Sequence, residues 1–296
     1  MVASPSPSPF SSPASAGTSA AAPHACASGP DGRAPLAVVT GAGAGIGAAL
    51  TASLLARGIE VVAIDRDTTS IDPRAERFAL DVRDAAGMAR LAERWRGRAA
   101  SHVFANAGVG GLPGDVLDLA DDAWQWTWDV NVLGALRTLR LWWPHLRQGG
   151  AGRAVATLSP AGLTSFPGAG PYRASKAALL AALEGLHYQA RGSGVTVHAM
   201  CPGMVRTTIL ELDRYPEAAA RPGTGAPPNP FAAHLAAAMA GAEPAATFAE
   251  RVLAELDGGS APFYWQTHAG TGAWIAGRHR AIEQRLAPFA DFGAPQ

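Results

Sequence analysis

The stretch LAVVTGAGAGIG, residues 36–47, joins a short apolar run to a glycine-rich turn. The run over 36–40 has the composition of a strand that is buried on both faces. The turn fails the pattern GxGxxG read from Gly41, because Ile46 stands at the last glycine position, but it fits TGxxxGxG with Gly41, Gly45 and Gly47. Glycines let the backbone approach a phosphate, and the following helix start supplies free N–H groups. The stretch predicts a dinucleotide-binding turn, with a plain flexible turn as the alternative.

Beyond this turn, short apolar runs alternate with longer segments of helical periodicity. Further strands are predicted over 61–65, 76–82, 102–108, 153–159, 195–203 and 262–267, and helices over 45–57, 84–97, 119–147 and 171–191. Runs that are apolar throughout indicate a parallel sheet with helices on both faces. We therefore predict a single α/β domain over 34–296 with a three-layer, doubly wound, Rossmann-like parallel sheet. Such a sheet binds its ligand at the carboxyl ends of the strands.

Two segments depart from the alternation. Residues 1–33 consist mainly of Ser, Pro, Ala and Gly, which offer too little apolar surface to compensate for the loss of chain entropy, so a disordered tail is predicted. The segment over about 208–245 contains a Pro/Gly-rich stretch at 214–231. Loops of this length are usually functional or disordered, and we predict a substrate lid.

The bulk properties exclude several classes of protein. The chain has 24 basic and 24 acidic residues, which gives no electrostatic case for binding nucleic acid or an anionic membrane. No apolar run approaches the roughly 20 residues that span a bilayer. The two cysteines, Cys26 and Cys201, make no disulfide framework, so we predict a cytoplasmic protein. No metal site is predicted, because no metal-ligand spacing relates four of the eight histidines, His145, His187, His198 and His268.

Asp65 ends the strand predicted over 61–65, about 20 residues beyond the glycine turn. A carboxylate at this place accepts hydrogen bonds from the ribose hydroxyls of adenosine and repels a 2′-phosphate. The neighbouring Arg66 could instead bind that phosphate. We predict NAD as the cofactor, with NADP as the alternative. Asp81 and Val82 could bracket the adenine, although a solvated aspartate at a helix start explains Asp81 nearly as well.

Tyr172 and Lys176 are four residues apart on one predicted helix, so their side chains share a face. An ammonium near a phenol favours the phenolate and makes it a better base. The pattern YxxxK is common by itself, but here several motifs follow one another in order. They are TGxxxGxG at 40–47, NAG at 106–108, Asn131, Ser159, YxxxK at 172–176, and Pro202 and Gly203 with Thr207. Together they resemble the short-chain dehydrogenase/reductase family over about residues 34–268.

The resemblance implies a role for each of these residues. Tyr172 would be the general acid/base on the substrate oxygen, and Ser159 would hold that oxygen. Lys176 would also bond the nicotinamide ribose, Asn131 would hold a water that continues the proton relay, and Thr207 would bond the carboxamide. The residues expected to contact the cofactor are Gly41, Gly45, Ile46, Gly47, Asp65, Arg66, Asp81, Val82, Asn106, Ala107, Gly108, Tyr172, Lys176, Pro202, Gly203, Val205 and Thr207. The family also suggests a homodimer or homotetramer that packs through the 119–147 and 171–191 helices.

The chain departs from the family pattern at Pro160, where a second serine is common, and in its C-terminal PFYWQTHAG. Apolar side chains are expected around the reacting carbon; they are Pro160, Leu163, Phe166, Met204, Ile209 and Leu210. The predicted reaction is therefore hydride transfer between NAD and an apolar secondary alcohol or ketone. Two alternatives remain on the same fold: a non-catalytic nicotinamide-binding sensor or scaffold, and an epimerase or dehydratase that uses bound NAD transiently.

Overall fold

The computed structural model describes residues 33–111, 116–117, 119–164, 168–209, 239 and 241–266. The predicted tail, apart from its last residue, and most of the predicted lid lie outside these ranges. Phe166 and Leu210, which were expected at the reacting carbon, lie outside them as well.

The centre of the molecule is a seven-stranded sheet in the order β3-β2-β1-β4-β5-β6-β9. Every neighbouring pair of its strands is parallel. The strands are β1 (Leu36–Thr40), β2 (Glu60–Asp65), β3 (Glu76–Ala79), β4 (Ala100–Ala105), β5 (Gly152–Thr157), β6 (Val195–Cys201) and β9 (Tyr264–Gln266). The sheet confirms the predicted fold class, a doubly wound parallel α/β fold in a single domain.

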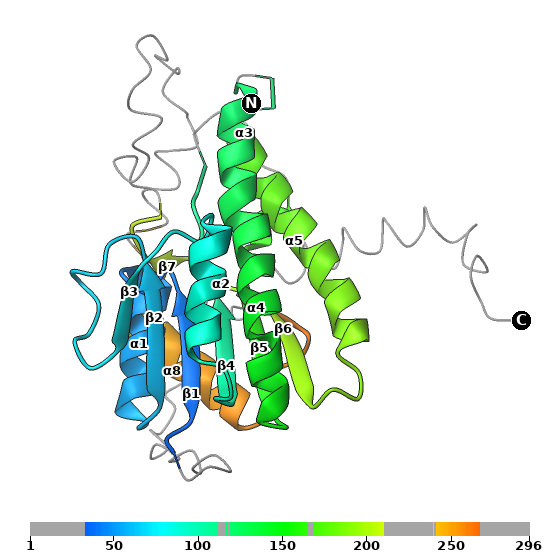
Figure 1. The fold of residues 1–296 in the computed structure, drawn as a ribbon. Helices are drawn as coiled ribbons and strands as arrows, with labels where there is room; N and C mark the ends of the chain where they lie inside the picture. Colours follow the sequence, from blue (N-terminus) through cyan, green and yellow to red (C-terminus); the bar gives the residue numbers. More distant parts are fainter. Residues whose placement is uncertain are drawn as a thin grey trace, which may run out of the picture.

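Helices cover both faces of the sheet. They are α1 (Gly45–Ala56), α2 (Ala85–Arg94), α4 (Ala135–Gln148), α5 (Gly170–Gln189) and α8 (Ala245–Asp257). In Figure 1, α2, α4 and α5 lie in front of the sheet and α8 lies behind it. One buried apolar cluster joins the sheet to α2, α4 and α5, and a second joins its other face to α1 and α8. In the described part of the chain, no helix combines the length and apolar character needed to cross a membrane.

The helix predicted over 119–147 has three parts. It begins as α3 (Asp121–Trp128), passes through a π-helical turn at Asp129–Gly134 and continues as α4. Gly134 allows this turn to approach the segment between β3 and α2, since a Cβ there would stand 2.7 Å from Cγ2 of Val82. π-turns inside α-helices are frequent at functional sites, and this one carries the predicted site residue Asn131.

The third strand ends earlier than predicted, at Ala79 rather than at residue 82. The side chain of Asp81 accepts a hydrogen bond from the backbone N–H of Arg83 at 2.8 Å. This local bond turns the chain into the start of α2, where Asp84 accepts from the N–H of Gly87.

The strand order reverses at β1, because β2 lies on one side of it and β4 on the other. Ligands of doubly wound sheets bind at such a switch point, beyond the carboxyl ends of the strands. Beyond β6, a two-residue strand β7 (Val205–Arg206) pairs with β8 (Glu243–Pro244). This pairing brings together the two ends of the segment predicted as a lid.

Candidate active site

The glycine turn after β1 packs so closely that its glycines are required by the fold. Gly41 has a φ of +69°, and a Cβ on Gly47 would stand 2.0 Å from the carbonyl oxygen of Gly41. Ala44, the N-cap of α1, provides no side-chain hydrogen bond, and the first turn of α1 contains no acidic residue. The N-terminal N–H groups of α1 therefore favour an anion, and the turn fits the diphosphate of a dinucleotide.

Asp65 lies beside this turn at the carboxyl end of β2. Its carboxylate accepts hydrogen bonds from the backbone N–H groups of Gly43 at 2.8 Å and Asp67 at 3.2 Å. Gly43 leaves room for this contact, because a Cβ there would stand 3.0 Å from Cγ of Asp65. The carboxylate is thus fixed next to the predicted diphosphate position, as a ribose-binding residue requires.

Asp81, the predicted adenine neighbour, belongs to a small group of charges at the end of β3. Its carboxylate accepts from Nη2 of Arg83 at 2.9 Å. Partial burial raises the pKa of Asp81, but the hydrogen bonds and charge of Arg83, with the charge of Arg66, outweigh burial and lower that pKa. The charge of Arg66 therefore acts on Asp81, on the side of the site where the adenosine end of a cofactor is expected.

Asn106 holds together the carboxyl ends of three strands. Its Nδ2 donates to the carbonyl of Thr40 at 3.1 Å, and its Oδ1 accepts from Oγ1 of Thr157 at 3.0 Å. Oγ1 of Thr40 in turn accepts from the N–H groups of Asn106 and Ala107. Sequence reasoning did not assign a role to either threonine. Thr40 opens the glycine motif, which is a usable signal, whereas nothing in the pattern singles out Thr157.

Asn131 is fully buried, and its amide is engaged on both sides. Nδ2 donates to the carbonyl of Val109 at 2.9 Å and to Oγ of Ser175 at 3.0 Å, and Oδ1 accepts from the N–H of Val109 at 2.8 Å. These bonds attach the π-turn to the loop after β4 and to α5. The side chain thus connects these three segments, and its holding of a relay water stays a prediction.

Lys176 is 3% exposed, and its Nζ donates to the carbonyl of Thr157 at 2.8 Å. The same Nζ lies 5.8 Å from the ring centre of Tyr172. A Cβ on Gly108 would stand 3.4 Å from Nζ, so the absence of a side chain there leaves space beside the amine. Burial lowers the pKa of Lys176 to about 8, and nearby Cys201 opposes this shift. The amine is therefore still largely protonated at neutral pH.

Ser159 stands in the loop directly after β5, where its Oγ accepts a hydrogen bond from the N–H of Ala161 at 3.2 Å. The hydroxyl hydrogen of a serine that accepts in this way remains a donor for another oxygen. Tyr172 lies half-buried in the first turn of α5, and Oγ of Ser175 donates to its carbonyl at 2.7 Å. The end of β5 and the start of α5 thus carry the predicted Ser159, Tyr172 and Lys176 set.

The segment after β6 returns to the glycine turn. Pro202 and Gly203 lead into β7, whose Val205 is buried, and a Cβ on Gly45 would stand 2.8 Å from Cγ2 of Thr207. This places Thr207 at the N-terminus of α1, as a cofactor-contacting residue requires. Across the described ranges, no three His, Cys, Asp or Glu side chains form a group that could hold a metal ion.

Comparisons with known proteins agree with this geometry. The profile of the short chain dehydrogenase family matches residues 35–217. The chain is 32% identical over 191 residues to the 2-(R)-hydroxypropyl-CoM dehydrogenase of Xanthobacter autotrophicus, covering 60% of this chain and 76% of that protein. It is also 32% identical over 241 residues to the L-tagatose-forming galactitol 2-dehydrogenase of Cereibacter sphaeroides, covering 75% and 93%.

Two solved structures of short-chain dehydrogenases are similar and carry different cofactors. A protein from Burkholderia phymatum in complex with NAD has a TM-score of 0.75 and 29% identity, covering 85% of this chain and 95% of that one. One from Burkholderia cenocepacia in complex with NADP has a TM-score of 0.66 and 25% identity, covering 86% and 97%. The sheet, the glycine turn and these matches together show that the chain belongs to the short chain dehydrogenase family of oxidoreductases.

Proposed function

We propose that this protein is an NAD-dependent alcohol dehydrogenase or ketone reductase that acts on an apolar secondary alcohol or ketone. The observation that carries the proposal is the buried amine of Lys176, which donates to the end of β5 and lies 5.8 Å from the ring centre of Tyr172. Removing an ammonium from water is costly and usually marks a functional requirement.

In the proposed reaction, Tyr172 gives a proton to the substrate oxygen or takes one from it. The charge of Lys176 favours the phenolate form of the tyrosine, and the hydroxyl of Ser159 donates to the same substrate oxygen. When bound, the nicotinamide supplies or accepts the hydride. The hydrogen bond from the N–H of Ala161 to Oγ of Ser159 fixes the serine oxygen before the substrate arrives, which avoids reorganisation during the reaction.

The preference for NAD is proposed from Asp65. Its carboxylate is held against the glycine turn by the N–H of Gly43, so it cannot swing away from a cofactor without losing that bond. A 2′-phosphate placed about 4 Å from this charge would be repelled by about 4 kcal/mol at an effective dielectric of 20. The positive charges of Arg66 and Arg83 would attract a 2′-phosphate, but both charges already interact with the carboxylate of Asp81.

The apolar substrate is proposed from the residues that follow β5 and β6. Pro160 and Leu163 flank the Ser159 turn, and Met204 precedes β7. The two ends of the 208–245 segment are brought together by the β7–β8 pair, next to Thr207. This supports a lid that closes over an apolar group and excludes water. A cytoplasmic homodimer or homotetramer that packs through the 119–147 segment, from α3 to α4, and through α5 completes the proposal.

The experiment is to follow oxidation of NADH and of NADPH with cyclohexanone, acetophenone, 2-octanone and the polar ketose tagatose. We expect a higher kcat/KM with NADH than with NADPH, and with the apolar ketones than with tagatose. Preference for NADPH would overturn the cofactor proposal, and preference for tagatose would overturn the substrate class. Absence of any turnover, with NADH binding intact, would favour a nicotinamide-binding sensor.

The acid/base role is tested with Tyr172→Phe, which removes only the phenolic oxygen. We expect turnover to fall by about 10²- to 10⁴-fold, the range typical of lost proton transfer. Binding of NADH, followed by its fluorescence, should remain. Retention of most of the activity would show that another group moves the proton.

A further inference from the structure

The Ser159 turn and helix α5 touch each other through their backbones at Gly162. The turn is a 3-10 helix at Pro160–Gly162, and Gly162 is buried. A Cβ at this position would stand 2.8 Å from the carbonyl carbon of Lys176 and 2.9 Å from the nitrogen of Ala177. Cβ contacts under 3.0 Å essentially never occur, so a side chain here would push the turn and the helix apart.

Glycine is needed at position 162 because there is no space for a side chain. Gly162 does not have the positive φ that favours glycine at Gly41 and Gly45. The atoms that a methyl group would meet belong to the backbone of α5, which cannot rotate away as a side chain can. The contact is therefore a fixed spacing between two rigid segments.

A second connection closes the same turn from its other end. Nε of Arg173 donates to the carbonyl of Thr164 at 3.1 Å, and Oγ1 of Thr164 donates to the carbonyl of Pro160 at 2.7 Å. Arg173 is the neighbour of Tyr172 on α5. The turn is thus fixed to the helix beside both predicted catalytic residues, at Gly162 next to Lys176 and at Arg173 next to Tyr172.

The position of the serine oxygen depends on this turn. Oγ of Ser159 accepts from the N–H of Ala161, so a displacement of the turn also displaces that oxygen. Resting on the proposed function, we infer that Gly162 and Arg173 are positioning residues that set the distance from the Ser159 hydroxyl to Tyr172 and Lys176. Misplacement of a reacting group by about 1 Å can reduce the rate about 10²-fold.

The experiment compares Gly162→Ala with Gly185→Ala, a matched control on α5 whose Cβ would meet nothing within 4 Å. The probe is whichever of cyclohexanone, acetophenone and 2-octanone the wild-type protein reduces fastest with NADH. We expect kcat of Gly162→Ala to fall about 10- to 100-fold, with the dissociation constant of NADH unchanged within about twofold. Gly185→Ala should behave as wild type in both measurements, and size-exclusion chromatography checks that its oligomeric state is unchanged.

A double-mutant cycle separates positioning from a general structural effect. If Gly162 acts by placing the Ser159 hydroxyl, adding Gly162→Ala to Ser159→Ala should cost no more than about twofold in kcat, because the group to be placed is already absent. An equal fold-loss in the two backgrounds would overturn the inference, and so would a loss of NADH affinity as large as the loss in kcat. If Ser159→Ala itself left kcat unchanged, the proposed role of Ser159 would be wrong. That outcome is distinguishable from a failure of the inference about Gly162, in which Ser159→Ala lowers kcat but Gly162→Ala costs the same in both backgrounds.

If Gly162→Ala does not fold, Arg173→Met provides a second test of whether the turn is held in place by α5. It removes the donor to Thr164 while retaining a long side chain. We expect a smaller loss in kcat than for Gly162→Ala, again largely absent in the Ser159→Ala background, and faster hydrogen exchange at the N–H groups of Gly162 and Leu163, which bond within the turn. Unchanged exchange and unchanged kcat would show that Arg173 does not hold the turn.

Discussion

The two ends of the central sheet each bury a basic side chain, and the two side chains are held in different ways. At the carboxyl end, the amine of Lys176 donates to the carbonyl of Thr157 and lies near Tyr172. Toward the amino end, the ring of His102 on β4 stacks on Phe104 with centres 5.8 Å apart, and its Nε2 has no hydrogen-bond partner among the described residues. Burial lowers both pKa values, that of Lys176 to about 8 and that of His102 to about 3.

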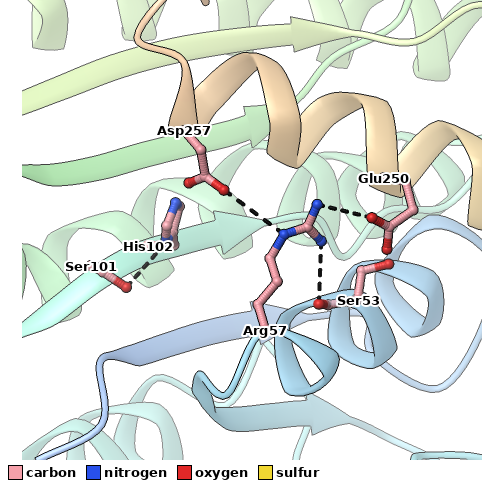
Figure 2. A network of polar contacts seen from close by, with 6 residues as sticks. All are labelled: Ser53, Arg57, Ser101, His102, Glu250 and Asp257. Carbon is pink, nitrogen blue, oxygen red and sulfur yellow. Dashed lines mark hydrogen bonds and ion pairs between the residues drawn. The ribbon is translucent and has the colours of Figure 1, made fainter. Parts of the chain in front are cut away.

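The contacts of His102 explain why it remains neutral. Oγ of Ser101 donates to the carbonyl of Leu36, so toward Nδ1 of His102, 3.0 Å away, it acts as an acceptor (Figure 2). Nδ1 of His102 then carries the proton, and Nε2 is the unprotonated ring nitrogen. Burial is the main cause of the low pKa of His102, and electrostatic interactions with Arg153, His198 and Arg57 lower it further. Two carboxylates of the same region, Glu250 and Asp257, both pair with Arg57.

The comparison teaches that a strongly shifted pKa is not sufficient to identify a catalytic group. Lys176 keeps its proton at neutral pH and presents it beside a phenol, at the end of the sheet where ligands bind. His102, with a pKa lowered to about 3, takes no proton at neutral pH, and its ring stacks on Phe104. Retention of a charge at neutral pH, rather than the size of the pKa shift, distinguishes the end of the sheet at which we propose the active site.

The largest effect is expected for Lys176→Met, which removes the charge at nearly constant volume. Turnover should fall about 10²- to 10⁴-fold, as for other lost proton-transfer groups. Because an ammonium with a lowered pKa is destabilised by burial, the same variant should unfold at a higher urea concentration at pH 7. Lower stability with lower activity would mean that the hydrogen bond to Thr157 outweighs the cost of burying the charge.

For His102 the expected effect is on stability and its dependence on pH. The ring binds a proton in the unfolded chain near pH 6.5 but not in the folded protein until about pH 3, so stability is lost as the pH falls below 6.5. Between pH 7 and pH 5 the loss should be about 2 kcal/mol. Urea unfolding at the two pH values measures it, and His102→Phe, which keeps a ring but cannot titrate, should reduce the loss by that amount. Turnover at pH 7 should not change.

A loss of stability that is identical in wild type and His102→Phe would contradict this account. The lowered pKa of His198 contributes in the same direction, so some pH dependence should persist in the variant. Only the difference between the two proteins reports on His102.

Much of this arrangement could be predicted from the sequence, because it depends on local pattern. The strands and the glycine turn follow from apolar runs and from Gly41, Gly45 and Gly47, and the YxxxK spacing places Tyr172 and Lys176 on one helix face. The roles of the site residues remain predictions until they are measured.

What the sequence could not show depends on contacts between distant segments. The acceptor of Lys176 is a backbone carbonyl, which every residue possesses, so no side-chain type marks Thr157. The π-turn at Asp129–Gly134 lies close to Val82, a contact between distant segments that local periodicity does not report. The spacing role of Gly162 depends on the backbone of α5. His102 stands in an apolar strand; burial mainly lowers its pKa, and the charges of Arg57 and Arg153 on other elements add to that effect.

A smaller effect, on the preference between NADH and NADPH, is expected for a substitution of Asp65 that changes its charge alone. Asp65→Asn retains an oxygen that can accept from the N–H of Gly43 but loses the repulsion of a 2′-phosphate. The ratio of kcat/KM for NADH to that for NADPH should fall by about 10-fold or more, since even part of the roughly 4 kcal/mol of repulsion is sufficient. Asp65→Ala, which also frees the turn, should in addition weaken binding of both cofactors. An unchanged ratio in Asp65→Asn would assign the selection to Arg66 and Arg83.

The smallest effect is expected where the amino end of the sheet meets solvent, at the ion pairs between α1 and α8. Arg57 is 8% exposed and lies between Glu250 and Asp257, as Figure 2 shows, but Glu250 itself is 56% exposed. Exposed ion pairs contribute about 0–1 kcal/mol and are screened by salt. Glu250→Gln should therefore lower the free energy of unfolding by less than about 1 kcal/mol, less in 0.5 M NaCl than at low salt, because Asp257 still compensates Arg57. Turnover should equal that of wild type. A loss of several-fold in kcat would show that α8 transmits strain to the carboxyl end, and the separation between the two ends of the sheet would then not hold.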